Sequence, residues 1–411
     1  MTNRGFTTGI LHSDRQNAIE HGSLHKPIHT SIAYGQPSGQ GIADVFQGKQ
    51  AGFTYSRQVN PTVNALEDKI TGMEQGIASI CFSTGMAAIT ATMLSLLKSG
   101  DHVVSSTYLF GNTNSFLMTL ANFGIEVTFV DATDVNHVRE ACRPTTRLVF
   151  TETIANPCTQ VSDLDAIGQL CAEPNVLYVI DNTMTSPYLF HPKTVKAGLV
   201  INSLSKYICG HGNALGGSIT DCGTFDWTRF DNILPQYRSG DPSRWGLQQI
   251  RKKGLRDTGA TLAPHVAHTI ATGAETLALR MPAACANAAK LAAWFSTHPK
   301  VNKVYYPGLA QHPQNARTKQ LFRYPGAIMS IELIETIDCL AFLDKLRLAI
   351  ISTNLGDNRT LALPVAQTIY HEMGPERRAE MGIGDATVRL SVGIEDYSDL
   401  EADFQQALDA C

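Results

Sequence analysis

Short apolar runs and amphipathic stretches alternate along most of the chain, and this alternation predicts its architecture. Between residues 61 and 257, stretches with helical spacing, such as Met86–Leu97 and Asp163–Cys171, separate short runs rich in β-branched residues. The runs that read as strands are 102–106, 126–130, 147–151, 177–181, 199–204 and 216–220. Apolar strands separated by helices are typical of a mostly parallel sheet covered on both faces. We therefore expect an α/β domain here.

The two ends of the chain follow different patterns. Residues 1–60 are rich in Gly, Ser, Gln and His with little periodicity, and such an arm is often ordered by a neighbouring subunit. From Thr258 to Thr297 we expect two helical segments with a break near Pro282. Further strands, interleaved with helices, are expected at 301–308, 327–333, 349–353 and 386–394. The expected division is an arm (1–60), a large domain (61–257) and a smaller α+β C-terminal domain (258–411).

Composition narrows the function classes. The 411 residues carry a formal net charge of -4, which gives no reason to expect nucleic acid or an anionic membrane as partner. No run approaches the roughly 20 apolar residues of a membrane helix, and the polar N-terminus lacks a signal-peptide core. The nine cysteines are scattered and never spaced C-x-x-C, so neither a disulfide framework nor a zinc site is indicated. We expect a cytoplasmic protein without a metal.

Polar residues at strand ends outline a cofactor site, because ligands of a parallel sheet bind at the carboxyl ends of its strands. Lys206 follows an apolar strand between Ser203 and Ser205. Burial there can lower the pKa of the amine and make it a Schiff-base nucleophile. Asp181 ends the preceding strand and suits a protonated pyridine nitrogen. The Ser-Thr-Gly of 83–85 opens a helix whose N–H groups suit a phosphate. Together these features predict pyridoxal 5′-phosphate (PLP) bound at Lys206.

Each of these features has an ordinary structural alternative when taken alone. A strand-end aspartate is more often a cap or turn residue, Ser-Thr-Gly is usually an N-cap, and a lysine near a strand usually extends to solvent. Rival motifs lack required parts. The S-x-x-K of 203–206 has no S-D-N or K-T-G partner, the glycine-rich 205–217 fits no nucleotide-binding pattern, and His265 and His268 lack further metal ligands. The combination favours the PLP site.

Six motifs in this order resemble the Cys/Met-metabolism family of PLP enzymes. They are Y-S-R-Q-V-N-P-T (55–62), F-S-T-G-M-A-A (82–88), E-T-I-A-N-P (152–157), D-N-T (181–183), S-L-S-K-Y-I-x-G-H (203–211) and V-R-L-S-V-G-I-E (388–395). The family contains cystathionine γ-synthases, cystathionine and methionine γ-lyases, and O-acetylhomoserine sulfhydrylases. The resemblance implies the aspartate-aminotransferase-like fold and a homotetramer, built from dimers that share their active sites.

The resemblance also implies roles for the matching residues. Lys206 is the Schiff-base lysine and the proton shuttle, Asp181 pairs with the pyridine nitrogen, and Thr183 belongs to the same cofactor site. The expected phosphate ligands are Gly85, Met86, Ser203 and Ser205, joined by Tyr55 and Arg57 of the neighbouring subunit. Asn156 faces the ring hydroxyl. Arg389 binds the substrate α-carboxylate, a bidentate task for which Arg is suited, whereas without the family a surface ion pair would be favoured for it.

Departures from the family pattern bear on the reaction. Phe110 stands where lyases and synthases have a tyrosine that stacks on the ring and can assist the leaving group. Phenylalanine can stack but cannot donate a proton. The segments L-F-G-N-T (109–113) and T-N-L-G-D (353–357) are similar to those of some O-acetylhomoserine sulfhydrylases. Asn354, expected at the substrate, replaces a Ser that lyases tend to have, and Asn112 stands where methionine γ-lyases carry Cys.

An acetate-like leaving group needs less protonation than a thiolate, so these departures favour γ-substitution. We expect an O-acyl-homoserine to react with sulfide or a small thiol, giving homocysteine. A methionine or cystathionine γ-lyase, or a cystathionine γ-synthase, is the alternative, because the early steps are shared. An alternative of another class is a non-catalytic PLP-binding protein, against which the presence of Lys206 and Asp181 argues.

Two segments depart further from the family pattern. The family's P-A-S-x-T-H reads P-V-A-Q-T-I at 364–369, which indicates a changed substrate entrance. The stretch Phe225–Arg256, with Trp227, Tyr237 and Trp245, either shapes that entrance or is a partly packed surface loop.

Overall fold

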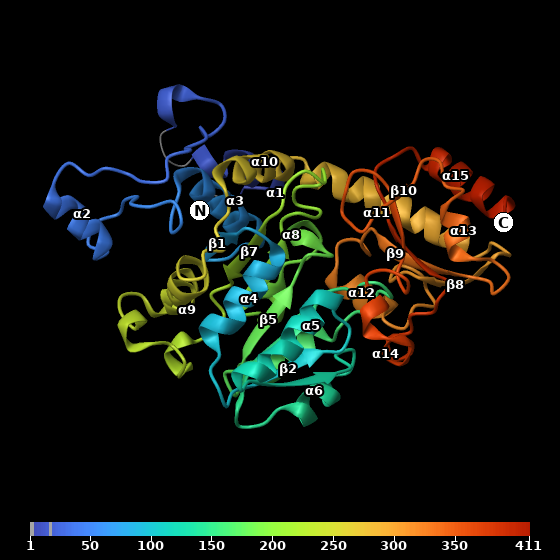
Figure 1. Cartoon of the computed structure of the whole chain (residues 1–411), viewed down its shortest axis with the longest axis horizontal. Coiled ribbons are helices and arrows are strands. Elements are labelled where there is room, and N and C mark those ends of the chain that lie inside the picture. Colours follow the sequence, from blue (N-terminus) through green and yellow to red (C-terminus); the bar gives the residue numbers. More distant parts are fainter. Residues whose placement is uncertain (1–3, 16–18) are drawn as a thin grey trace.

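The computed structural model describes residues 4–15 and 19–411. A large α/β body and a smaller α+β body lie side by side, and part of the N-terminal arm projects from the large body (Figure 1). The expected two-domain α/β fold is confirmed.

A seven-stranded sheet forms the centre of the large body. Its strands are β1 (Ala78–Phe82), β2 (His102–Ser106), β3 (Glu126–Val130), β4 (Thr146–Glu152), β5 (Leu177–Asp181), β6 (Leu199–Ser203) and β7 (Gly217–Asp221). Their spatial order is β1-β7-β6-β5-β4-β2-β3. The strands β2 to β6 are parallel, whereas β7 pairs antiparallel with β6 and β1. The sequence analysis missed β1, because its short apolar run leads directly into the polar turn that opens the next helix.

Helices cover both faces of this sheet. They are α3 (Pro61–Glu74), α4 (Gly85–Leu96), α5 (Gly111–Thr119), α6 (Val135–Ala141), α7 (Leu164–Ala172), α8 (Ser186–Leu189) and α9 (Trp245–Gln249). Alternate side chains of β5 enter two separate cores. Tyr178 and Ile180 pack in the core that includes α3 and α7, whereas Leu177 and Val179 pack with α4. Burial on both faces explains why these strands are apolar throughout. None of the helices in the described ranges is long and apolar enough to cross a membrane.

The stretch Phe225–Arg256 belongs largely to the second of these cores. Trp227 and Tyr237 are buried there, and the Trp227 indole Nε1 donates a 2.8 Å hydrogen bond to Asp221. The π-helical segment Ile250–Arg256 packs against α4. Of the two interpretations of this stretch, its position in the fold favours packing.

The C-terminal body has a second, five-stranded sheet. Its strands are β8 (Val301–Tyr305), β9 (Ile328–Leu333), β10 (Ile350–Ile351), β11 (Leu361–Pro364) and β12 (Thr387–Ser391), in the order β10-β11-β12-β9-β8. Its helices are α11 (Leu277–Phe295), α12 (Asn315–Leu321), α13 (Cys339–Leu343), α14 (Pro375–Glu380) and α15 (Tyr397–Asp409). Helix α10 (Pro264–Ala274) packs on α3 of the large body (Figure 1). The sequence analysis missed β11, which is short and ends in a proline.

The expected helix break near Pro282 is wrong. The chain breaks between α10 and α11, at 275–276, and Pro282 lies inside α11. A proline within a helix costs about 3 kcal/mol. The burial of neighbouring apolar side chains, including Met281 and Cys285, offsets that cost.

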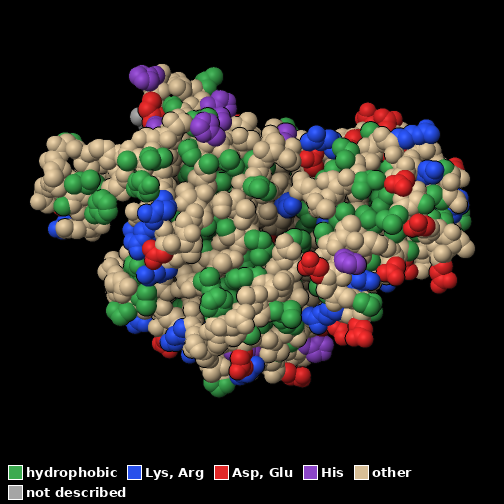
Figure 2. Space-filling view, in the orientation of Figure 1, with side chains coloured by type: hydrophobic (Ala, Val, Ile, Leu, Met, Phe, Trp, Pro, Cys, Tyr) green, Lys and Arg blue, Asp and Glu red, His purple; other side chains and the backbone are tan. Residues whose placement is uncertain are grey.

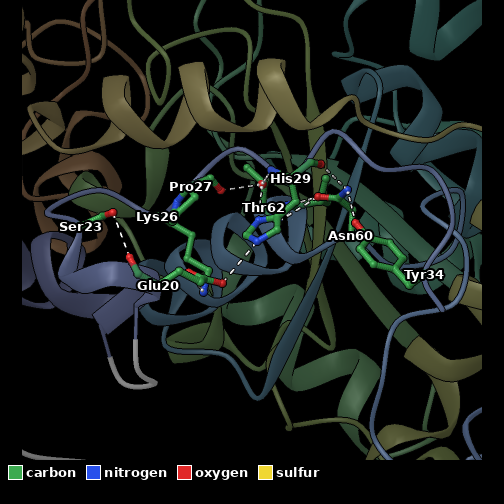
Figure 3. Close-up of polar contacts among 9 residues, drawn as sticks. Glu20, Ser23, Lys26, Pro27, His29, Tyr34, Asn60 and Thr62 are labelled. Atoms are coloured by element: carbon green, nitrogen blue, oxygen red, sulfur yellow. Dashed lines mark hydrogen bonds and ion pairs between the residues drawn. The ribbon is translucent and has the colours of Figure 1, made fainter. Parts of the chain in front are cut away.

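The N-terminal arm has an anchored part and a projecting part. Helix α1 (Phe6–His12) packs on α3 and buries Ile10 in the main core. Asn60, the N-cap of α3, donates to the His29 carbonyl at 2.9 Å and to the Tyr34 hydroxyl at 3.1 Å, and Thr62 donates to the Pro27 carbonyl (Figure 3). By contrast, helix α2 (Gly39–Phe46) lies away from the body (Figure 1).

A buried acid connects α3 to the two strands that lead into the predicted site. Oε1 of Glu74 accepts hydrogen bonds from Asn182 at 3.0 Å and Asn202 at 2.6 Å. Its Oε2 is buried without a hydrogen-bond partner among the described residues. Burial raises the pKa of this carboxyl to about 7.

This raised pKa predicts a pH-dependent stability. Because the folded pKa exceeds the reference value of 4.5, the stabilisation from protonated Glu74 is complete below that value and is lost as the pH rises through about 7. We expect deprotonation of Glu74 to lower the free energy of unfolding by on the order of 2 to 3 kcal/mol between about pH 5 and about pH 8. Glu74→Gln should lack that loss in denaturant titrations. Exposed Glu335→Gln, the control, should keep the wild-type profile. A Glu74→Gln profile as steep as that of wild type would contradict the assignment.

Candidate active site

The predicted lysine lies at the junction of the two bodies, which is called the crevice below. Lys206 follows the carboxyl end of β6, and its Nζ donates a 2.7 Å hydrogen bond to Oδ1 of Asn354 in the C-terminal body. Burial, and then the charge of Arg389, lowers the pKa of the Lys206 amine to about 8. A lysine with this pKa has a substantial neutral fraction near neutral pH, which a Schiff-base nucleophile requires.

Arg389 on β12 extends into the same crevice. It is 1% exposed, and its Nη2 donates to the carbonyls of Thr353 at 3.1 Å and Asn354 at 2.7 Å. Its Nη1 lies 3.4 Å from Oδ1 of Asn156. Burial lowers the pKa of the guanidinium to about 10, and its buried Nε has no acceptor within the described part of the chain. The alternative of a surface ion pair is therefore wrong, and a carboxylate would supply the missing acceptor.

Two acids, one buried and one half-buried, lie side by side on the neighbouring strands. Asp181 on β5 is paired in register with Glu152 on β4. Oδ1 of Asp181 accepts from the Thr183 backbone at 2.9 Å, and Oε1 of Glu152 accepts from the Phe110 backbone at 2.7 Å. Burial raises the pKa of both carboxyls, and the charge of Asp181 adds to the effect on Glu152. Such a pair gains from a cation between or beside its members, and a protonated pyridine nitrogen is one.

The first turn of α4 lies against the end of β6. A Cβ on Gly85 would lie 2.9 Å from Cβ of Ser203, so glycine is required for this close approach. Thr84 caps the helix by accepting from Ala87 at 3.0 Å. The N–H groups of Gly85 and Met86, in the first helical turn, have no acceptor within the helix. This arrangement suits a phosphate beside the Ser203 hydroxyl.

Thr183 and Ser205 make contacts that the sequence did not specify. The Thr183 hydroxyl accepts from the Ser203 backbone at 2.8 Å, which connects the turn after Asp181 to the end of β6. The Ser205 hydroxyl accepts from Gly216 N at 2.9 Å and lies 3.2 Å from Gly216 O. Ser205 thus uses its hydroxyl to shape the turn around Lys206.

Tyr55 and Arg57 lie apart from this group. The Arg57 guanidinium stacks 5.4 Å from the centre of the Tyr55 ring and donates to the Arg256 carbonyl at 2.6 Å. Neither side chain hydrogen-bonds to another predicted site residue in the ranges that the structure describes. Their role in a neighbouring subunit's site stays a prediction.

Glu152 and Tyr370 are the two site residues that the sequence analysis left without a role. Glu152 is the first residue of the motif E-T-I-A-N-P (152–157), so the sequence did contain a signal for it. Tyr370 follows the altered segment 364–369, and its hydroxyl lies within hydrogen-bonding distance of the Asn156 and Leu109 carbonyls. Local sequence pattern could not reveal the contacts of Tyr370, because its partners are more than 200 residues away along the chain.

Comparisons with known proteins agree with this geometry. The family described as Cys/Met metabolism PLP-dependent enzyme matches residues 7–409. An L-methionine gamma-lyase of Fusobacterium nucleatum subsp. polymorphum is 36% identical over 409 residues, which are 98% of each chain. An O-acetyl-L-homoserine sulfhydrylase of Corynebacterium glutamicum is 35% identical over 419 residues, covering 98% of this chain and 96% of its own.

A solved structure extends the likeness to three dimensions. It is a putative O-acetylhomoserine (thiol)-lyase from Campylobacter jejuni with N'-pyridoxyl-lysine-5'-monophosphate at its own position 205. The TM-score is 0.94 at 30% identity, and the match covers 99% of this chain and 100% of that one.

The crevice and the fold around it define a PLP-dependent enzyme of the aspartate-aminotransferase-like fold. More narrowly, the chain belongs to the Cys/Met metabolism family of PLP-dependent enzymes. Lyases and sulfhydrylases occur among its relatives at nearly equal identity, so identity does not separate the two reactions.

The pKa of Lys206 can be measured without any substrate. In the cofactor-free protein, reductive methylation of Lys206 should rise with pH with a midpoint at about pH 8, since the neutral amine is the reactive form. Exposed lysines such as Lys49 in the same sample are the internal control. Arg389→Met should move the Lys206 midpoint upward, because it removes a nearby positive charge. Peptide mass spectrometry gives both midpoints. A Lys206 midpoint equal to that of the exposed lysines would refute the assignment.

Proposed function

We propose that this protein catalyses γ-substitution on an O-acyl-homoserine, with sulfide or a small thiol as the second substrate. The products are homocysteine, or the corresponding thioether, and the free carboxylic acid. The observation that carries the proposal is Phe110, which has no hydroxyl at the position where a proton donor would assist a thiolate leaving group. A carboxylate leaves without such help.

The proposed cofactor site uses the residues of the crevice. Lys206 would hold PLP as a Schiff base, and Asp181 would pair with its ring nitrogen. Asn156 would face the ring hydroxyl, and Phe110 would stack on the face of the ring. The phosphate would bind the first turn of α4 and the Ser203 hydroxyl. When bound, PLP supplies an electron sink for the charge left when a proton leaves the substrate α-carbon.

The remaining chemistry belongs to the side chains. Arg389 would bind the substrate carboxylate through Nε and a second N–H, which fixes the α-carbon beside Lys206. The neutral amine of Lys206 would take the α-proton and then carry protons between adjacent carbons. Asn354 holds that amine at 2.7 Å while its own carbonyl holds Arg389, so one residue orients both the base and the carboxylate clamp.

A γ-lyase acting on methionine is the second candidate. It is supported by the methionine lyases among the relatives, including the Fusobacterium enzyme at 36% identity. In that reaction water takes the place of the thiol in the overall balance, and the products are methanethiol, ammonia and an α-keto acid. A lyase would need another proton donor for the thiolate, and Tyr108 lies only two residues before Phe110. The Tyr108 hydroxyl, however, lies 3.4 Å from Asp131.

We also propose a homotetramer of dimers that share active sites, working in the cytoplasm. Apolar side chains gather on the projecting arm (Figure 2), where Ile32 is 66% and Phe46 is 65% exposed. A second copy of the chain would cover them, since a surface of this kind is an interaction site. All nine cysteines are free, in keeping with a reducing compartment.

Paired assays on one preparation test the reaction. O-acetyl-homoserine with sulfide should give homocysteine, and methionine or cystathionine alone should give little α-ketobutyrate. Lys206→Ala should abolish both, because it removes the base and the cofactor anchor. Phe110→Tyr restores the missing hydroxyl and should raise α-ketobutyrate release from methionine by roughly tenfold. Dominant keto-acid release by the wild-type protein would overturn the substitution proposal.

Complementation in coexpressed variants tests the shared site. Arg57→Ala and Lys206→Ala should each lack most activity. Coexpressed, they should recover about a quarter of wild-type activity, because half of randomly paired dimers are hybrids with one complete site. As the control, Lys206→Ala coexpressed with Asp181→Ala should recover nothing, because both residues come from the same subunit and every site of a hybrid lacks one of them. No recovery by Lys206→Ala with Arg57→Ala, although hybrids form, would contradict the shared site, because Arg57 would then serve the lysine of its own subunit.

A further inference from the structure

We propose that Tyr370 is a positioning residue that holds together the two loops carrying Phe110 and Asn156. The inference rests on the proposed function, because that function assigns both residues to the PLP ring. It concerns the chain's own geometry, and the main readout of its test, the spectrum of the bound cofactor, needs no substrate.

Tyr370 connects three segments that are far apart in sequence. It follows β11, whereas Leu109 precedes α5 and Asn156 follows β4. The Tyr370 side chain is 1% exposed, and its hydroxyl lies 3.3 Å from the Leu109 carbonyl and closer still to the Asn156 carbonyl. One buried hydroxyl therefore bridges both loops.

The peptide group before Phe110 is held at both of its polar atoms. Its carbonyl, on Leu109, faces the Tyr370 hydroxyl, and its N–H, on Phe110, donates to Glu152 at 2.7 Å. The next residue is restricted as well, because a Cβ on Gly111 would lie 3.1 Å from the Ile369 carbonyl. With its peptide fixed on two sides, the Cα–Cβ bond of Phe110, from which the ring extends, has a defined direction.

The second loop is held in a similar way. Tyr370 contacts the Asn156 backbone, and the Asn156 side chain faces Arg389 at 3.4 Å. Loss of the hydroxyl would remove the one proton that these two carbonyls share, which favours movement of the loops. The position of Asn156, and with it the carboxylate clamp, would then be less well defined.

The aromatic ring of Tyr370 has a separate, structural role. It packs in a small apolar cluster with Leu363, Val365, Met381 and Ile383. Tyr370→Phe keeps this packing and removes only the hydroxyl, so it separates positioning from folding. A matched control is Tyr306→Phe, because Tyr306 is equally buried and its hydroxyl donates to the Gly326 carbonyl at 3.1 Å.

The test compares the visible circular dichroism of bound PLP in the wild-type, Tyr370→Phe, Tyr306→Phe and Phe110→Leu proteins. This signal reports the asymmetric surroundings of the cofactor ring. Tyr370→Phe should reduce it and lower kcat/KM for the preferred substrate by about tenfold. Tyr306→Phe should lose comparable thermal stability and keep the wild-type signal.

The outcomes separate this inference from the proposed function. A changed signal in both Phe110→Leu and Tyr370→Phe supports the positioning role. A changed signal in Phe110→Leu with a wild-type signal in Tyr370→Phe overturns it and leaves the proposed site intact. A wild-type signal in Phe110→Leu overturns the ring role of Phe110, and the positioning role that depends on it.

Discussion

The burial of charged groups in one crevice is the constraint on which the rest of the site depends. Four such groups lie at the junction of the two bodies: Lys206, Arg389, Asp181 and Glu152. Burial lowers the pKa of the two bases and raises the pKa of the two acids, so it favours the neutral form of each. Burying such groups costs free energy unless partners compensate. A ligand with a cationic ring, a phosphate and a carboxylate would supply those partners. PLP joined to an amino acid has these three groups.

Hydrogen bonds make the crevice a single unit. Lys206 bonds to Asn354, whose carbonyl accepts from Arg389, and Arg389 faces Asn156. Tyr370 and Glu152 extend the connections to Phe110. A displacement of any one of these residues would therefore also displace its hydrogen-bonded neighbours. In catalysis by orientation, small displacements carry large costs in rate.

The sequence predicted those parts of the fold and site that depend on local pattern. The parallel strands were readable because burial on both faces makes them apolar throughout. Asp181 and Lys206 could be proposed as site residues because the first ends such a strand and the second follows one. Strand β1 was not readable, because its short apolar run leads directly into a polar turn. The continuous helix through Pro282 was not readable, because tertiary packing outweighs local preference there. The bond from Lys206 to Asn354 spans 148 positions, and Tyr370 meets Leu109 across 261, so no local pattern signals either contact.

The central claim is that Lys206 binds PLP in this crevice. Borohydride reduction of the PLP-loaded protein converts a lysine-bound imine into a stable secondary amine, and peptide mass spectrometry then locates the modified residue. The account predicts one dominant pyridoxyl-modified peptide, containing Lys206 and absent from Lys206→Ala. Modification spread over surface lysines, or a dominant modified peptide without Lys206, would contradict it.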